Sequence, residues 1–133
     1  MEIQAKQPTV KGPPEIFTGE VWFDIIITGG HYQRMRVNTV RFAPSARTAW
    51  HSHPRGQTLY VTEGCGLVQS RGGRVIEIRA GDVIDTPPGE EHWHGAAPDH
   101  FMTHLALWEV DDQGASATWG AHVTDAEYRG QRV

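Results

Sequence analysis

The chain has 133 residues, a formal net charge of −4 and one cysteine, which together predict a single domain without disulfide support. Its 12 lysine and arginine residues are interspersed with 16 acidic ones, so we expect neither nucleic acid nor a membrane surface as a partner. No apolar run approaches the roughly 20 residues of a membrane span, and residues 1–14 lack the features of a signal peptide. The lone Cys65 fits a reducing compartment, and we expect a cytoplasmic protein.

Short strand-like runs, each bounded by glycine or proline, recur along the chain. A break at Gly12-Pro13-Pro14 follows a loose N-terminal arm. The runs that come after it are Val21–Ile27, Met35–Phe42, Thr48–His51, Thr58–Thr62, Gly66–Gln69, Val75–Ile78, Asp82–Asp85, His92–His94 and Phe101–Val110. Helical periodicity is nearly absent, except that Thr124 could cap a short helix that reaches Tyr128. We therefore expect an arm over residues 1–18 and one all-β domain, a barrel or sandwich with a short C-terminal helical segment, over residues 19–133.

Two His-x-His pairs stand out among the eight histidines of the chain. Side chains alternate between the two faces of a strand, so His51 and His53 point the same way if they share a strand, and so do His92 and His94. Gln57 has the parity of the first pair. Imidazoles that face each other inside a barrel suit zinc, copper, iron or nickel, and an added amide oxygen extends the range towards manganese. The spacing therefore predicts a metal site.

His104 is a single histidine inside an apolar run. On its own, such a residue is more often a buried histidine with a hydrogen-bond partner than a metal ligand. The residues alone leave its role open.

The two histidine pairs stand inside two longer motifs. His51-x-His53, Gln57 and Gly64 resemble the first cupin motif, and Gly81, Pro87, Gly89 and His92 resemble the second. The match runs from about Val21 to Val110 and implies the double-stranded β-helix, or jelly-roll barrel, of the cupins. It also implies metal ligands at His51, His53 and His92. Most metal-binding cupins have glutamate where this chain has Gln57.

More closely, the chain resembles a small group of bacterial cupins, the manganese-dependent hydroxynitrile lyases. The shared stretches are residues 46–51, 56–59, 92–98, 102–106 and 122–125. Because glutamine is a ligand in that group, the resemblance implies a divalent ion on His51, His53, Gln57 and His92. Mn²⁺ is the expected ion, with Fe²⁺, Ni²⁺ or Zn²⁺ as alternatives. The resemblance further implies that Thr48, His94 and His104 line the pocket as catalytic residues, and a tryptophan at position 108 that faced the lumen would narrow it.

The expected substrate is a small molecule, either a cyanohydrin or, in the reverse direction, an aldehyde with cyanide. A neutral amide ligand leaves the double charge of the ion uncancelled, which favours Lewis-acid chemistry over redox chemistry. His94 and His104 could take up and return the proton, because a histidine pKa lies at about 6.5. A cupin dioxygenase or other oxidoreductase and a non-catalytic ligand-binding cupin remain as alternatives. We also expect a homo-oligomer that forms through exposed sheet edges.

Overall fold

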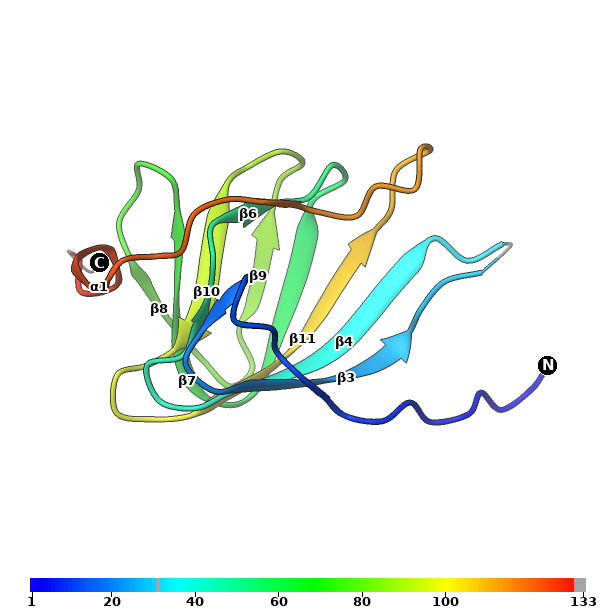
Figure 1. Ribbon diagram of the computed structural model, residues 1–133, viewed down its shortest axis with the longest axis horizontal. Helices are drawn as coiled ribbons and strands as arrows, with labels where there is room; N and C mark the ends of the chain where they lie inside the picture. Colours follow the sequence, from blue (N-terminus) through cyan, green and yellow to red (C-terminus); the bar gives the residue numbers. More distant parts are fainter. Residues whose placement is uncertain (31, 131–133) are drawn as a thin grey trace.

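The computed structural model describes residues 1–30 and 32–130. Its strands form two antiparallel sheets that curl around a common interior (Figure 1). The first sheet contains, in spatial order, β1 (Val10–Lys11), β3 (Val21–Ile27), β4 (Met35–Phe42), β11 (Met102–Glu109), the first half of β7 (Gln57–Ser70) and β9 (Val83–Thr86). The second contains β8 (Ile76–Arg79), the second half of β7, β10 (His92–Ala96), β5 (Arg47–Thr48), β6 (His51–Ser52), β2 (Phe17–Thr18) and β12 (Thr118–Trp119). The expected all-β architecture is confirmed.

The long strand β7 joins the two sheets. We expected two separate strands, Thr58–Thr62 and Gly66–Gln69, but the structure makes them one. Gly64 has a φ of 76°, and a Cβ atom at this position would collide with the carbonyl oxygen of Phe101, so the bend needs glycine. The register between β7 and β11 also shifts beside this point, as a β-bulge does. The apparent break in the sequence is therefore a bend within one strand.

The interior is filled by side chains that alternate along the strands. Val40 and Phe42 of β4 are buried while Arg41 between them is exposed, and Leu59 and Val61 of β7 follow the same rule. This alternation places apolar side chains of both sheets in one core. A smaller core cluster lies outside the second sheet and contains Trp50, Leu67, Val75, Trp93, Val123 and Tyr128.

The C-terminal helix α1 (Asp125–Tyr128) begins as expected at Thr124. The Thr124 hydroxyl accepts a hydrogen bond from the backbone N–H of Glu127 at 3.1 Å, and the Glu127 carboxylate accepts one from the Thr124 N–H at 2.9 Å. This reciprocal cap satisfies two backbone donors. None of the helices in the described part of the chain is long and apolar enough to span a membrane.

The expected arm over residues 1–18 divides into two parts. Residues 1–9 have no regular structure and extend away from the sheets (Figure 1). Residues 10–18 instead add β1 and β2 to the sheets, and Phe17 is part of the core. These two-residue strands, like β12, are too short to show a pattern in the sequence. At the other end, residues 131–133 of the expected domain lie outside the described residues.

Candidate metal centre

Three buried histidines meet where β6 and β10 pair. His51 of β6 lies directly opposite His92 of β10 in the ladder, and their ring centroids are 4.3 Å apart. His53 follows β6 and points to the same place. One ring nitrogen from each of the three lies within 4.8 Å of the other two. This convergence of nitrogen donors could hold a metal ion.

A backbone carbonyl orients each of the three imidazoles. The distances from Nδ1 to the carbonyl oxygen are 3.0 Å for His51 and Ala49, 2.8 Å for His53 and Ser116, and 2.9 Å for His92 and Glu90. A carbonyl can only accept, so in a neutral ring Nδ1 carries the hydrogen and Nε2 presents a lone pair. Metal-binding histidines are commonly held in this way. The three Nε2 lone pairs are thus fixed toward a common point.

Gln57, the first residue of β7, adds an amide oxygen to the three nitrogens. Its Oε1 lies 3.1 Å from Nε2 of His92. A neutral His92 has one ring hydrogen, and its two nitrogens face two acceptors, the Glu90 carbonyl and the Gln57 amide oxygen. With its Nδ1 hydrogen donated to the Glu90 carbonyl, a neutral His92 turns its Nε2 lone pair toward the Gln57 side-chain amide. A cation could bind this lone pair together with the Gln57 oxygen, and it would also pair with Nε2 of His53, which is buried and has no hydrogen-bond partner among the described residues. The four donors fit a metal ion.

The three clustered histidines are electrically neutral at neutral pH. Burial lowers the pKa of His51 well below its usual value of 6.5 and that of His53 to about 4, and it also lowers the pKa of His92. For His51, the neighbouring His92 adds to the effect of burial. A site of three neutral imidazoles and an amide leaves the full charge of a bound cation uncancelled.

A second pair of histidines lies beside this centre. His94, two residues after His92 on β10, places Nδ1 2.9 Å from Nε2 of His104 on β11. Burial lowers the pKa of His94 well below its usual value and that of His104 to about 4, so at neutral pH one N–H is shared between two neutral rings. The other two nitrogens, Nε2 of His94 and Nδ1 of His104, are buried without a partner in the described part of the chain.

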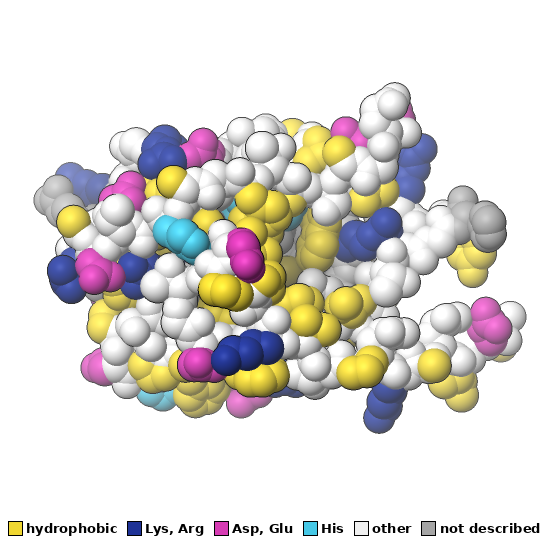
Figure 2. All heavy atoms as spheres, viewed as in Figure 1, with side chains coloured by type: hydrophobic (Ala, Val, Ile, Leu, Met, Phe, Trp, Pro, Cys, Tyr) yellow, Lys and Arg dark blue, Asp and Glu magenta, His cyan; other side chains and the backbone are white. Residues whose placement is uncertain are grey.

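A cavity of about 140 Å³ lies against both groups of histidines. The histidine groups and their surroundings contribute Thr48, His51, His53, Gln57 and His94 to its lining. Strands β4 and β11 contribute Asn38, Val40, Ala106 and Trp108, and the remaining lining residues are Ile16, Phe17, Phe23 and Trp119. A cavity of roughly 150 Å³ can hold one benzene ring. In the space-filling view, hydrophobic side chains gather around a hollow near the middle of the face shown (Figure 2). The cavity suits a small, mostly apolar molecule.

The expected pocket residues do not all reach the cavity. Thr48 and His94 line the cavity, and the Thr48 hydroxyl accepts the backbone N–H of His94 at 3.2 Å, so its own hydrogen can point elsewhere. His104 has no exposed surface and does not line the cavity. It lies behind His94 and can act on the cavity only through that ring. Trp108 lines the cavity, with its ring centroid 5.7 Å from that of His53.

Three residues that shape the site through a ring contact, a carbonyl or a side-chain amide were not identified from the sequence. Trp119 of β12 stacks on His51 with centroids 4.5 Å apart, Ser116 orients His53 through its carbonyl, and Asn38 lines the cavity from β4. The first two lie in residues 111–124, where no periodic pattern draws attention. Asn38 stands on the inward face of a strand that was predicted correctly, so the alternation of that strand could have found it.

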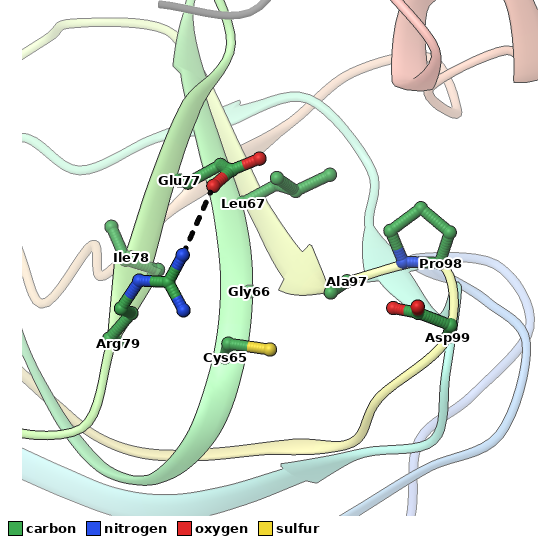
Figure 3. A pocket seen from close by; sticks show the side chains of 9 residues that line it. All are labelled: Cys65, Gly66, Leu67, Glu77, Ile78, Arg79, Ala97, Pro98 and Asp99. Atoms are coloured by element: carbon green, nitrogen blue, oxygen red, sulfur yellow. Dashed lines mark hydrogen bonds and ion pairs between the residues drawn. The ribbon is translucent and has the colours of Figure 1, made fainter.

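A second hollow, of about 380 Å³, lies on the other side of β7, and Figure 3 shows the side chains that line it. Arg79 of β8 pairs there with Glu77 at 3.5 Å, Cys65 lies on β7, and Asp99 belongs to the loop that follows β10. Its charged side chains are exposed to solvent. It contains no histidine among its lining residues and no convergent donors, so the smaller cavity is the better candidate for the functional site.

Residues 38–122 match the family of the cupin domain. This chain belongs to the cupin family. The cupin is 50% identical over 131 residues to a protein of Granulicella tundricola named (R)-mandelonitrile lyase, and the match covers 97% of this chain and 99% of the relative. It is also similar to the crystal structure of a cupin-like protein from Thermotoga maritima, with 40% identity and a TM-score of 0.86 over 97% of this chain and 96% of that one. The polyketide cyclase RemF of Streptomyces resistomycificus, 20% identical with a TM-score of 0.70 over 96% and 89% of the two chains, shares the fold.

Proposed function

We propose that this cupin is a metal-dependent lyase that cleaves cyanohydrins and, in reverse, forms them from an aldehyde and cyanide. We assign a divalent ion, Mn²⁺ in the first place, to His51, His53, Gln57 and His92. The observation that carries the proposal is a neutral four-donor centre beside a neutral histidine pair, with His51, His53, Gln57 and His94 of these two groups lining one small cavity. The name of the Granulicella tundricola relative supports the choice of a cyanohydrin.

When bound, the ion would supply a Lewis acid that polarises an oxygen atom of the substrate and acidifies a hydroxyl group. Gln57 matters because an amide, unlike a carboxylate, does not reduce the charge that the oxygen experiences. The neutral donor set therefore supports Lewis-acid chemistry.

His94 receives the hydroxyl proton at Nε2, the nitrogen that His104 leaves free. The Nδ1–H that His94 donates to Nε2 of His104 fixes the tautomer in which Nε2 of His94 accepts the proton. The buried imidazolium that results is disfavoured, so it readily gives the proton up again. The carbon–carbon bond breaks, its electron pair stays on the cyanide carbon, and the substrate oxygen becomes the carbonyl of the aldehyde. His94 then returns the proton to cyanide, which leaves as HCN. The Thr48 hydroxyl is placed to donate to the reacting oxygen.

A parallel assay separates this function from its alternatives. The purified protein is loaded with Mn²⁺, its metal content is measured, and benzaldehyde release from mandelonitrile and oxygen uptake are followed side by side. We expect benzaldehyde release without oxygen uptake, and we expect the His92→Ala protein to release none. A fully loaded protein that releases no benzaldehyde would contradict the lyase proposal, and oxygen uptake would favour an oxidoreductase.

We also propose a homo-oligomer. Strands β8 and β9 each pair with β7 on one side only, which leaves open sheet edges of the kind through which chains associate. Light scattering after size-exclusion chromatography measures the oligomeric state, and a mass equal to one chain would contradict this part of the proposal.

A further inference from the structure

The wall of the cavity formed by β4 and β11 carries two hydrogen-bond donor groups, an indole and an amide, that have no acceptor among the described residues. We propose that the Trp108 indole and the Asn38 amide bind the nitrile nitrogen of the substrate. They would thereby position the cyanide group and make the site selective for nitriles. This inference rests on the lyase function proposed above. To the contacts proposed there for the substrate oxygen, it adds a contact for the nitrile group.

Trp108 lies beside the metal centre. It is opposite Gln57 in the ladder between β11 and β7, and its ring centroid is 5.7 Å from that of His53. Its Nε1 atom is buried, yet no acceptor for it exists in residues 1–30 and 32–130. Buried N–H groups without a partner are rare because each costs stability. An acceptor on a bound molecule would remove this cost.

Asn38 extends the same wall. It lies opposite Ala106 of β11, and Ala106 precedes Trp108 by two residues, on the same inward face. The Asn38 side chain lines the cavity and makes no hydrogen bond within the described residues. The small Ala106 side chain leaves space between the two donors. Elsewhere this wall is apolar, with Val40 of β4, and Phe23 of the neighbouring β3 continues the apolar lining.

A nitrile suits this arrangement because its nitrogen accepts hydrogen bonds and donates none. In a cyanohydrin the hydroxyl and nitrile groups branch from one carbon, so the oxygen can face Thr48 and His94 while the nitrogen faces the opposite wall. When the carbon–carbon bond breaks, its electron pair stays with cyanide, and part of the negative charge develops on the nitrogen. Hydrogen bonds from Asn38 and Trp108 then become stronger, which favours cleavage.

The test compares two probes of nearly the same shape. Phenylacetonitrile has the nitrile nitrogen, whereas 3-phenylpropyne has a C–H group in its place, and neither can undergo the lyase reaction. Calorimetric titration of the Mn²⁺-loaded and the metal-free protein gives the affinity for each. We expect the wild type to bind the nitrile roughly 3–10-fold more tightly than the alkyne, which is the contribution of one or two neutral hydrogen bonds.

Two variants locate the preference. Trp108→Phe keeps an aromatic ring without the N–H, and Asn38→Leu keeps the size of the side chain without the amide. We expect the preference for the nitrile to shrink in each and to vanish in the double variant. Trp22→Phe is the matched control, since it makes the same change at a residue of β3 that is 43% exposed and does not line the cavity.

An equal affinity of the wild type for the two probes would overturn the proposal, as would a preference that survives the double variant. The wild-type comparison needs no variant to fold. Because binding is measured without turnover, the two proposals can fail separately. A nitrile preference without cyanohydrin cleavage would leave the binding site standing and refute the lyase, and cleavage without the preference would do the reverse.

Discussion

The buried position of His104 predicts how the stability of the protein depends on pH. Its ring has no exposed surface, and burial lowers its pKa from 6.5 to about 4 in the folded state. The unfolded chain therefore binds a proton at a higher pH than the folded chain does. As the pH falls from 6.5 towards 4, this residue lowers the free energy of unfolding.

The size of the effect follows from the two pKa values. Between pH 8 and pH 5.5, a single group with an unfolded pKa of 6.5 and a folded pKa of about 4 reduces the free energy of unfolding by about 1.4 kcal/mol. His104→Leu removes the titrating group and keeps an apolar side chain in its place. Between pH 8 and pH 5.5, the free energy of unfolding of the wild type should thus fall by about 1.4 kcal/mol more than that of the variant.

The assay is urea unfolding of both proteins at pH 8 and pH 5.5, after metal has been removed with a chelator. The other buried histidines are common to the two proteins. Of these, His94 changes its surroundings in the variant, because it shares an N–H with His104 and because His104 contributes to lowering its pKa. Val61→Ala is the control, because Val61 lies opposite His104 in the ladder and its loss weakens packing without removing a titrating group. A difference between wild type and His104→Leu that does not change with pH would refute the reasoning.

The remaining predictions concern metal and turnover. His92→Ala should lose most of the metal and nearly all activity, and full occupancy by elemental analysis would contradict the ligand assignment. Gln57→Glu should retain the metal but cleave cyanohydrins more slowly, because the carboxylate lowers the charge on the ion; undiminished steady-state cleavage would show that this charge is unimportant. His94→Ala should keep the metal and lose roughly 10²–10⁴-fold in kcat, as expected when a general base is removed. His104→Leu should lower kcat less than His94→Ala does, because His104 acts on the substrate only through His94. A larger loss of kcat in His104→Leu, measured in the same kinetic assay, would contradict the position of His104 behind His94.

Much of the fold could be predicted because local rules decide it. In β4, the alternation of Val40, Arg41 and Phe42 indicates a strand with one buried face, and the structure has that strand at the predicted bounds. The bend in β7 was not predicted because Gly64 has the same signature in a turn and in a bulge. Which of the two forms depends on whether β11 continues alongside, and that is a contact between residues distant in the sequence.

In the candidate site, too, local patterns predicted some features, whereas others depend on contacts between distant residues. The parity of His51 and His53 and the resemblance to cupins placed these residues in one cluster with His92, and the structure brings the three together. The depth of His104 could not be predicted in this way. Parity shows which face of a strand a residue occupies, but His94 and His104 lie on strands of different sheets. Which ring reaches the cavity depends on how the two sheets pack.

The backbone carbonyls that orient His51, His53 and His92 affect how this sequence can change over evolutionary time. Each amino acid contributes the same carbonyl group, so replacements at positions 49, 90 and 116 can accumulate without altering the hydrogen bond to the imidazole. Insertions, deletions and proline near these positions are different, because they displace the backbone itself. Among natural variants of this protein, we expect the length of the segment around Ser116 to be preserved more strictly than the identities of its residues.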